Sequence, residues 1–179
     1  EAGRVAAEQD REAELHIEVS AIMAEAETRL ESYQGKGYAE LYRQRLSGFD
    51  EKNVLMEIAK GLARRMAYGD IIRVAQLKTR PGRQKDLLGD VAAGEVVNVT
   101  EYFRPGLREV CDILPAPLAK RILAWAEAKP KRLRLSWPMA MRSTTVSGFI
   151  VLRFLAALRP LRRVSYRYRM EQAAIETWL

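Results

Sequence analysis

The feature that most constrains this fold is a long stretch of helical periodicity near the start of the chain, over residues 4–34. Its apolar residues recur at three- and four-residue spacing, which stacks them on one face of a helix. They are Leu15, Val19, Ile22, Ala26, Leu30 and Tyr33. Gly35 and Gly37 follow, and glycine readily adopts the left-handed backbone that ends a helix. We therefore expect one long, acidic N-terminal helix.

Similar spacing along the rest of the chain predicts a mainly α fold, a bundle-like domain of several helices. The expected helices cover about 38–47, a long helix capped by Asp50 that continues past Gly69 to Leu77, about 107–114, about 117–129, a helix capped by Thr144 or Thr145 that stops at Pro160, and about 162–178. A glycine inside a helix costs about 1 kcal/mol relative to alanine. Gly69 therefore indicates close packing or a kink.

The length of 179 residues is sufficient for one domain with a real hydrophobic core. We expect a single helical domain over 1–179, with an acidic helix over 4–34, a helical body over 38–128 and a basic helical part over 129–179. The chain begins at Glu1 with no basic leader or cleavage-like site. We expect it to be excised from the C-terminal end of a larger cytoplasmic polypeptide.

Two short segments have β character. Residues 96–103 contain Val96, Val97, Val99, Tyr102 and Phe103 and partly alternate apolar with polar positions. A single strand needs a partner, and the other candidate is Leu133–Trp137. We expect both segments to be extended, and they could pair as a small ribbon.

Several classes of site and segment are disfavoured by composition. One cysteine allows no intrachain disulfide and no cysteine-ligated cluster, and one histidine with one cysteine cannot supply a zinc site. No phosphate loop or dinucleotide fingerprint occurs. The longest apolar run, Val146 to Leu158, contains Arg153 and is shorter than the roughly 20 residues that span a membrane. We expect this run to be a core helix, and no membrane partner.

The two residues that most often carry nucleophilic chemistry have simpler interpretations here. His16 lies in the acidic helix beside Glu12, which favours the charged imidazole over a poised base. Cys111 lies on the apolar face of its helix, where a free cysteine behaves as a small hydrophobe. We expect a surface histidine and a core cysteine, and we assign no catalytic, cofactor-binding or metal-binding residue.

Charge is divided unevenly along the chain. Residues 1–60 hold 13 acids and 8 bases, and residues 61–179 hold 22 bases and 10 acids. Within 129–169 there are 11 bases and no acid. Such a stretch creates a positive field that favours an anionic partner. The partner could be the acidic N-terminal helix, another domain, or a free anion or nucleic acid.

Polar residues cluster within the segment MAYGDIIRVAQLK, where Tyr68 lies close to Asp70 and Arg73. Asp70 and Arg73 are three apart, so they would form an ion pair on one helical face, or they could orient a substrate or brace a partner domain. Arg167 and Glu171 are four apart and should support the last helix by about 0.3 kcal/mol.

Five segments, taken in order, carry a resemblance to a known family. They are YAELYRQRL, LARRMAYGDIIRVAQLKTR, VTEYFRPGLREVCDILP, TTVSGFIVLRFLAALRPLRR and EQAAIETWL. Together they resemble the C-terminal helical domain of the indolepyruvate ferredoxin oxidoreductases over about residues 33–179. Many relatives have D-E-Y-E-V-A-R-L-Y after the aspartate. The departures after Asp70 suggest a branch in which subunits are separate.

The resemblance implies a role in a larger enzyme. That family oxidatively decarboxylates arylpyruvates such as indolepyruvate to acyl-CoA and passes electrons to ferredoxin. Thiamine diphosphate and iron–sulfur clusters do this chemistry in other domains or subunits, and CoA is a substrate. The implied partners of this domain are a preceding catalytic-type domain of the same polypeptide and a partner subunit.

The sequence also leaves candidate interaction residues and a second function class. The candidates are Tyr68, Asp70, Arg73, Lys78, Arg80, Arg162 and Arg163. The alternative function is a basic helical module that binds nucleic acid or another anion, with Trp137, Tyr166 and Tyr168 as stacking faces. No helix-turn-helix or RNA-module signature supports it.

Overall fold

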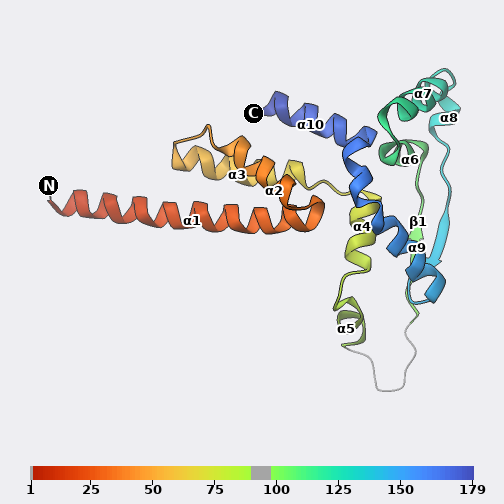
Figure 1. The fold of residues 1–179 in the computed structure, drawn as a ribbon, viewed down its shortest axis with the longest axis horizontal. Coiled ribbons are helices and arrows are strands. Elements are labelled where there is room, and N and C mark those ends of the chain that lie inside the picture. Colours follow the sequence, from red (N-terminus) through yellow and green to blue (C-terminus); the bar gives the residue numbers. More distant parts are fainter. Residues whose placement is uncertain (1, 90–97) are drawn as a thin grey trace. The chain divides into compact units, whose positions relative to one another are not determined.

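The computed structural model describes residues 2–89 and 98–179, which form two compact units (Figure 1). The first unit comprises Glu1–Tyr68 with Ile175–Leu179, and the second comprises Gly69–Ala174. Most described residues are helical, and the sheet among them is a two-stranded antiparallel ribbon. The predicted mainly α class is therefore confirmed. The part of the predicted extended segment at residues 96–97 lies outside the described residues.

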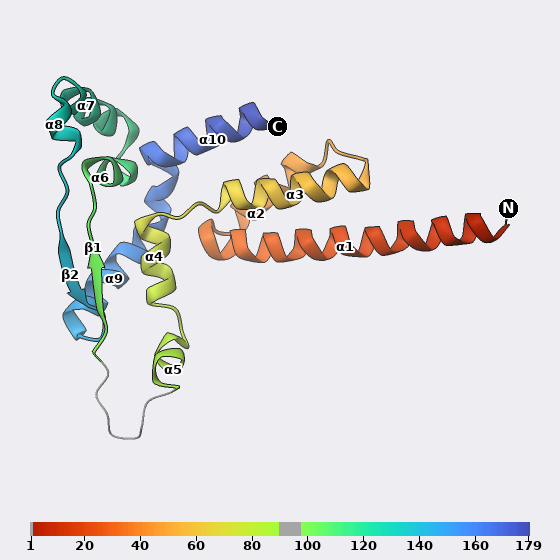
Figure 2. The same cartoon turned by 180° about the vertical axis from the view of Figure 1, so that it is seen from behind.

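Helices α1 (Ala2–Gln34), α2 (Lys36–Leu46) and α3 (Lys52–Met66) make up most of the first unit. Helix α1 packs against both α2 and α3 (Figure 2). Four of its buried apolar residues belong to the predicted stripe, namely Val19, Ala26, Leu30 and Tyr33. Gly35 separates α1 from α2 with φ 100°, a left-handed backbone that favours glycine. The predicted long N-terminal helix is confirmed.

Two buried tyrosines tie α2 to α3. The hydroxyl of Tyr38 donates to the carbonyl of Met66 at 3.0 Å, and that of Tyr42 donates to the carbonyl of Ala59 at 3.1 Å. Burial, with a smaller contribution from the Glu27 carboxylate, raises the pKa of Tyr42 to about 12. Its hydroxyl therefore remains a protonated donor at neutral pH. A buried hydroxyl without an acceptor would cost stability, so both contacts favour this pairing of helices.

The last residues of the chain belong to the first unit. Ile175 is buried, and Glu176 forms an ion pair with Arg45 of α2. The Trp178 ring lies over Gly61 of α3, where an added Cβ would be only 2.9 Å from the ring. The guanidinium of Arg65 lies 4.7 Å from the centre of that ring. The absence of a side chain at Gly61 thus lets the tryptophan approach α3 closely.

The predicted long third helix is wrong, because the helix ends before Gly69. Helix α3 ends at Met66, and α4 (Ile71–Lys78) begins with Asp70 as its N-cap. An added Cβ on Gly69 would have no neighbour within 4 Å, so this glycine is not a site of close packing. The predicted N-cap at Asp50 is also wrong. Glu51 occupies that position without a side-chain capping bond.

The second unit contains short helices and the ribbon. Helix α4 packs against α9 (Val146–Ala157), and Ile72, Ala75 and Leu152 are buried on these two helices. The remaining helical elements are α5 (Arg83–Leu88), α6 (Leu107–Ile113), α7 (Ala116–Glu127), α8 (Pro130–Leu133), the 3-10 helix η1 (Arg159–Val164) and α10 (Tyr166–Trp178). Helix α10 continues into the first unit. The last helix thus begins at Tyr166, later than predicted, because a 3-10 helix precedes it.

The ribbon pairs β1 (Thr100–Phe103) with β2 (Met139–Arg142) in antiparallel register. The predicted ribbon is confirmed, with its second strand a few residues later than the predicted Leu133–Trp137, since Leu133 ends α8. The register continues beyond β2 to a bridge between Gly106 and Ser136. Pro105 and Pro138 lie between the strands and this bridge and have no N–H to donate, which explains the interruption of the ladder.

Helix α9 begins at a tight cap. The Thr145 hydroxyl accepts from the backbone N–H of Gly148 at 3.2 Å, which confirms Thr145 as the predicted cap. The backbone of Gly148 lies so close to the Arg142 carbonyl that an added Cβ would overlap that oxygen. Glycine at this position therefore allows the end of β2 to turn directly into α9.

We expect Gly148→Ala to destabilise the protein by about 2 kcal/mol, because the methyl group overlaps backbone atoms that cannot move independently. A loss of stability would be informative, since replacing glycine by alanine in a helix ordinarily stabilises it by about 1 kcal/mol. Urea unfolding monitored by circular dichroism measures the change. Gly69→Ala is the control and should stay within about 0.5 kcal/mol of the wild type. Equal stability of both variants would contradict the close approach.

Candidate functional site

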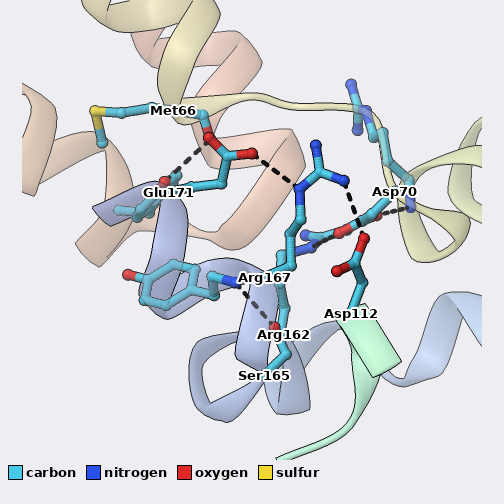
Figure 3. A network of polar contacts seen from close by, with 10 residues as sticks. Met66, Asp70, Asp112, Arg162, Ser165, Arg167 and Glu171 are labelled. Carbon is cyan, nitrogen blue, oxygen red and sulfur yellow. Dashed lines mark hydrogen bonds and ion pairs between the residues drawn. The ribbon is translucent and has the colours of Figure 1, made fainter. Parts of the chain in front are cut away.

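Asp70 and Arg162 form a buried ion pair in the second unit (Figure 3). The Arg162 Nε donates to Asp70 Oδ2 at 2.6 Å, and its Nη2 donates to Oδ1 at 3.0 Å. The side chains of Arg162 and Asp70 are only 1% and 8% exposed. This two-point geometry is the arrangement that a guanidinium and a carboxylate favour.

Asp70 also caps α4. Its Oδ1 accepts from the backbone N–H of Arg73 at 2.6 Å, which satisfies one of the free donors at the helix start. The predicted side-by-side pair of Asp70 and Arg73 on one helical face is wrong, because Asp70 precedes the helix and its carboxylate pairs with Arg162. One carboxylate thus holds together η1 and the N-terminus of α4.

A second polar network surrounds Arg167 (Figure 3). Its Nε donates to Glu171 at 2.9 Å, and its Nη1 donates to Asp112 of α6 at 3.0 Å. Partial burial lowers the pKa of Arg167, but the bonds to Asp112 and Glu171 and their charges more than reverse this, so the pKa is raised. The predicted helix pair of Arg167 and Glu171 is confirmed. Asp112 adds a link between α6 and α10.

Glu101 of β1 is a third meeting point of charges. Its Oε1 accepts from Lys78 Nζ at 2.5 Å and from Arg83 Nη2 at 3.0 Å. The exposed pair of Arg80 and Asp86 lies on the neighbouring segment, at 2.7 Å. Lys78 and Arg80, two predicted interaction residues, therefore make contacts within the chain.

The other candidates are divided between the units. Tyr68 is buried in the first unit, and its ring meets Tyr33 edge-on at 5.8 Å between ring centres. Arg163 is exposed, whereas its neighbour Arg162 is buried. Within the second unit, Asp70 and Arg162 come together through contacts that stabilise the fold.

His16 and Cys111 lie where the sequence predicted. His16 is exposed on α1. Cys111 is fully buried in a cluster with Leu107, Ala119, Leu123 and Ala126. Burial, and secondarily the Asp112 carboxylate, raises the pKa of the Cys111 thiol, which disfavours the reactive thiolate.

The exposed surface of the second unit is both apolar and basic. The run Val146–Leu158 was predicted to be a core helix, but only Gly148 and Leu152 of α9 are buried. Large apolar side chains of α9 remain exposed, namely Val146, Phe149, Ile150, Val151 and Phe154. Exposed bases occur along the acid-free stretch, namely Lys129, Lys131, Arg134, Arg142, Arg153, Arg163 and Arg169. The sequence revealed the charge but not the exposed apolar face.

The first unit has a shallow hollow of about 670 Å³ between the start of α1 and the start of α3. Its lining includes Glu12, Glu14 and Glu18 with Asp50 and Lys52. The Lys52 ammonium donates to the Glu12 carbonyl at 3.4 Å. Within residues 2–89 and 98–179, no group of three or more His, Cys, Asp or Glu side chains is arranged to hold a metal ion. None of the helices in these ranges has the length and apolarity to cross a membrane.

We expect Asp70→Asn to destabilise the protein by about 3 kcal/mol, because it leaves the buried Arg162 guanidinium without its counter-charge. Asparagine caps helices as well as aspartate does, so this variant isolates the loss of charge from the loss of the cap. Asp86→Asn is the matched control, since Asp86 belongs to an exposed ion pair. It should lower the free energy of unfolding by less than about 1 kcal/mol. Urea unfolding compares the two variants. Equal effects would mean that burial adds nothing to the Asp70 pair.

Comparison with known proteins identifies a family for most of the chain. A family model described as "Family of unknown function (DUF6537)" matches residues 19–179. The match begins at Val19, a buried residue of α1, and includes the buried Ala26, Leu30 and Tyr33 of that helix. No curated protein and no solved structure matches the chain. The chain therefore belongs to the DUF6537 family.

Proposed function

We propose that this chain is an accessory, non-catalytic domain of an indolepyruvate ferredoxin oxidoreductase. In this role it supports the thiamine-diphosphate-dependent oxidative decarboxylation of arylpyruvates to acyl-CoA, which other domains carry out. The observation that carries the proposal is that residues of the segments resembling that enzyme family are used to stabilise the fold. In two of the resembling segments, MAYGDIIRVAQLK and EQAAIETWL, polar and aromatic side chains form contacts within the chain.

The segment MAYGDIIRVAQLK illustrates this use. Tyr68 packs in the core of the first unit, and Asp70 caps α4 and pairs with Arg162. Ala75 is fully buried on α4. These contacts account for the segment's aromatic, acidic and small residues as requirements of folding. They support a scaffold role, because such residues are then not available to bind a substrate.

Residues of the C-terminal segment EQAAIETWL also form contacts that stabilise the fold. Glu171 accepts from Arg167, Ile175 is buried, and Glu176 pairs with Arg45. Trp178 packs over Gly61 beneath the Arg65 guanidinium. A segment that anchors the end of the chain in this way supports a structural function for the whole motif.

The cysteine content of the chain does not fit the iron–sulfur clusters of the parent enzyme. An iron–sulfur cluster of the usual kind takes four thiolates, whereas the chain has one cysteine and buries it in an apolar cluster. We therefore assign the iron–sulfur clusters to other domains of the enzyme, and the resemblance implies the same for thiamine diphosphate and CoA. The contribution of this chain is to hold a catalytic-type domain or a partner subunit in place.

A second function has one observation in its favour, the exposed bases between Lys129 and Arg169. Trp137 is exposed within this stretch and could stack on a nucleobase. Tyr166, in contrast, packs against the Cys111 cluster, and Tyr168 is partly buried. A nucleic-acid-binding module would bind generic duplex DNA or RNA with steep salt dependence. Binding that is already lost at low ionic strength would exclude this alternative.

The proposed function is tested by comparing the native complex with the isolated chain. A tag on this chain is used to purify it from its own cells, and the product is assayed for ferredoxin reduction that requires indolepyruvate and CoA. We expect turnover by the complex and none by the 179-residue chain, even with thiamine diphosphate and ferredoxin supplied. Turnover by the isolated chain would refute the scaffold role. A complex that contains no thiamine-dependent oxidoreductase would refute the choice of enzyme.

A further inference from the structure

Helix α9 has the composition of a buried helix but exposes one side. Arg153 is the only charged residue between Val146 and Ala157. A helix that is apolar on all sides is normally enclosed by protein, and a contiguous exposed apolar patch usually marks a binding surface. Among the seven large apolar side chains of α9, five are exposed, so packing within the second unit accounts for only Leu152 and, in part, Leu155.

The exposed side is a continuous stripe. Val146, Ile150 and Phe154 are four residues apart, so they line up along the helix, and they are 79%, 60% and 65% exposed. They are offset by two residues from the buried Gly148 and Leu152. Two residues correspond to about 200° around a helix, so the stripe faces away from the buried side. We call these three residues the α9 stripe.

The charged residues of the segment that contains the α9 stripe are all positive. Between Met139 and Val164, the charged residues are Arg142, Arg153, Arg159, Arg162 and Arg163, and none is acidic. Arg162 is committed to Asp70, whereas Arg142, Arg153 and Arg163 are exposed. Complementary charge across an interface favours encounter and excludes like-charged partners. An occupant of the stripe should therefore carry carboxylates beside its apolar residues.

We propose that the α9 stripe is the docking surface for an amphipathic helix of a partner protein, with an apolar face flanked by aspartate or glutamate. This proposal rests on the proposed function and places the partner helix on the thiamine-diphosphate-binding part of the same enzyme. The apolar residues of the partner cover Val146, Ile150 and Phe154, in the manner of a helix laid against a hydrophobic surface. Its carboxylates pair with Arg142, Arg153 or Arg163.

A second copy of the chain is a poorer occupant. An isologous contact through the stripe would place the same arginines of two copies near each other. Like charges brought together across an interface oppose association. An anionic membrane surface would match the charge, and it is therefore included as an alternative outcome of the test.

The test measures binding of the 179-residue chain to the separately prepared remainder of the enzyme by calorimetry. We expect Ile150→Glu to raise Kd by about 30-fold, because it places a carboxylate within the apolar contact. The exposed arginines of the segment cannot compensate for the lost packing. Ile17→Glu is the matched control, since Ile17 is an isoleucine on α1 that is 69% exposed. It should leave Kd unchanged. Circular dichroism and thermal unfolding verify that both variants fold.

A charge variant and a crosslinker supply independent readouts. We expect Arg153→Gln to weaken binding mainly through the association rate and to reduce its dependence on salt. A photoreactive phenylalanine analogue at position 150 of the native complex should crosslink to an apolar, acid-flanked helix of the thiamine-diphosphate-binding part. The same analogue at position 17 should not.

Each other result overturns the proposal. If the wild-type chain binds the remainder of the enzyme and Ile150→Glu binds equally well, the docking surface is wrong and the proposed function stands. If the wild-type chain does not bind at all, the proposed function fails and the docking proposal fails with it. If the wild-type chain sediments with phosphatidylserine vesicles and Ile150→Glu does not, the stripe binds a membrane surface. If the wild-type chain self-associates and Ile150→Glu does not, the stripe binds a second copy.

Discussion

The ion pair between Asp70 and Arg162 is the contact on which the second unit depends most. It removes two charges from water, and such a pair is tolerated only when its geometry and hydrogen bonds are good. The two-point contact and the capping bond to Arg73 meet this condition. Arg162 lies in η1, between α9 and α10, and Asp70 starts α4. The pair therefore sets where α4 begins and holds it beside the segment that follows α9.

The helix pair that this contact supports determines what is left for function. Because α4 covers one side of α9, the α9 stripe is the side that remains exposed. The motif residues at both ends of the resemblance are used in folding, and the large side chains exposed on α9 are apolar or, at Arg153, positively charged. This division underlies our proposal that the domain binds another protein and leaves catalysis to it.

Sequence reasoning succeeded where the decisive interactions are local. The α1 stripe, the Thr145 cap and the Arg167–Glu171 pair all depend on residues within one or two helical turns. It failed where the partner is distant in the chain, because neither periodicity nor spacing links Asp70 to Arg162 or Asp112 to Arg167. One local signal was available: Asp70 directly after Gly69 has the form of a helix N-cap, which would have predicted the break after α3.

The displaced second strand of the ribbon and the exposure of α9 were missed for different reasons. The segment Met139–Arg142 has no β-branched residue and weak alternation, so its pairing with β1 follows from the register rather than from its own propensity. Helix α9 has the composition of a core helix, and composition cannot distinguish burial within the chain from burial against a partner. The exposed stripe is therefore visible only in the structure.

The most direct test of this account is a double-mutant cycle for the ion pair. It compares the free energies of unfolding of the wild type, Asp70→Asn, Arg162→Met and the double variant in urea. We predict a coupling energy of about 2 kcal/mol or more, with the double variant more stable than the sum of the single effects implies, because removing both charges leaves none buried alone. A coupling energy near zero would contradict the central claim that the motif aspartate serves the fold.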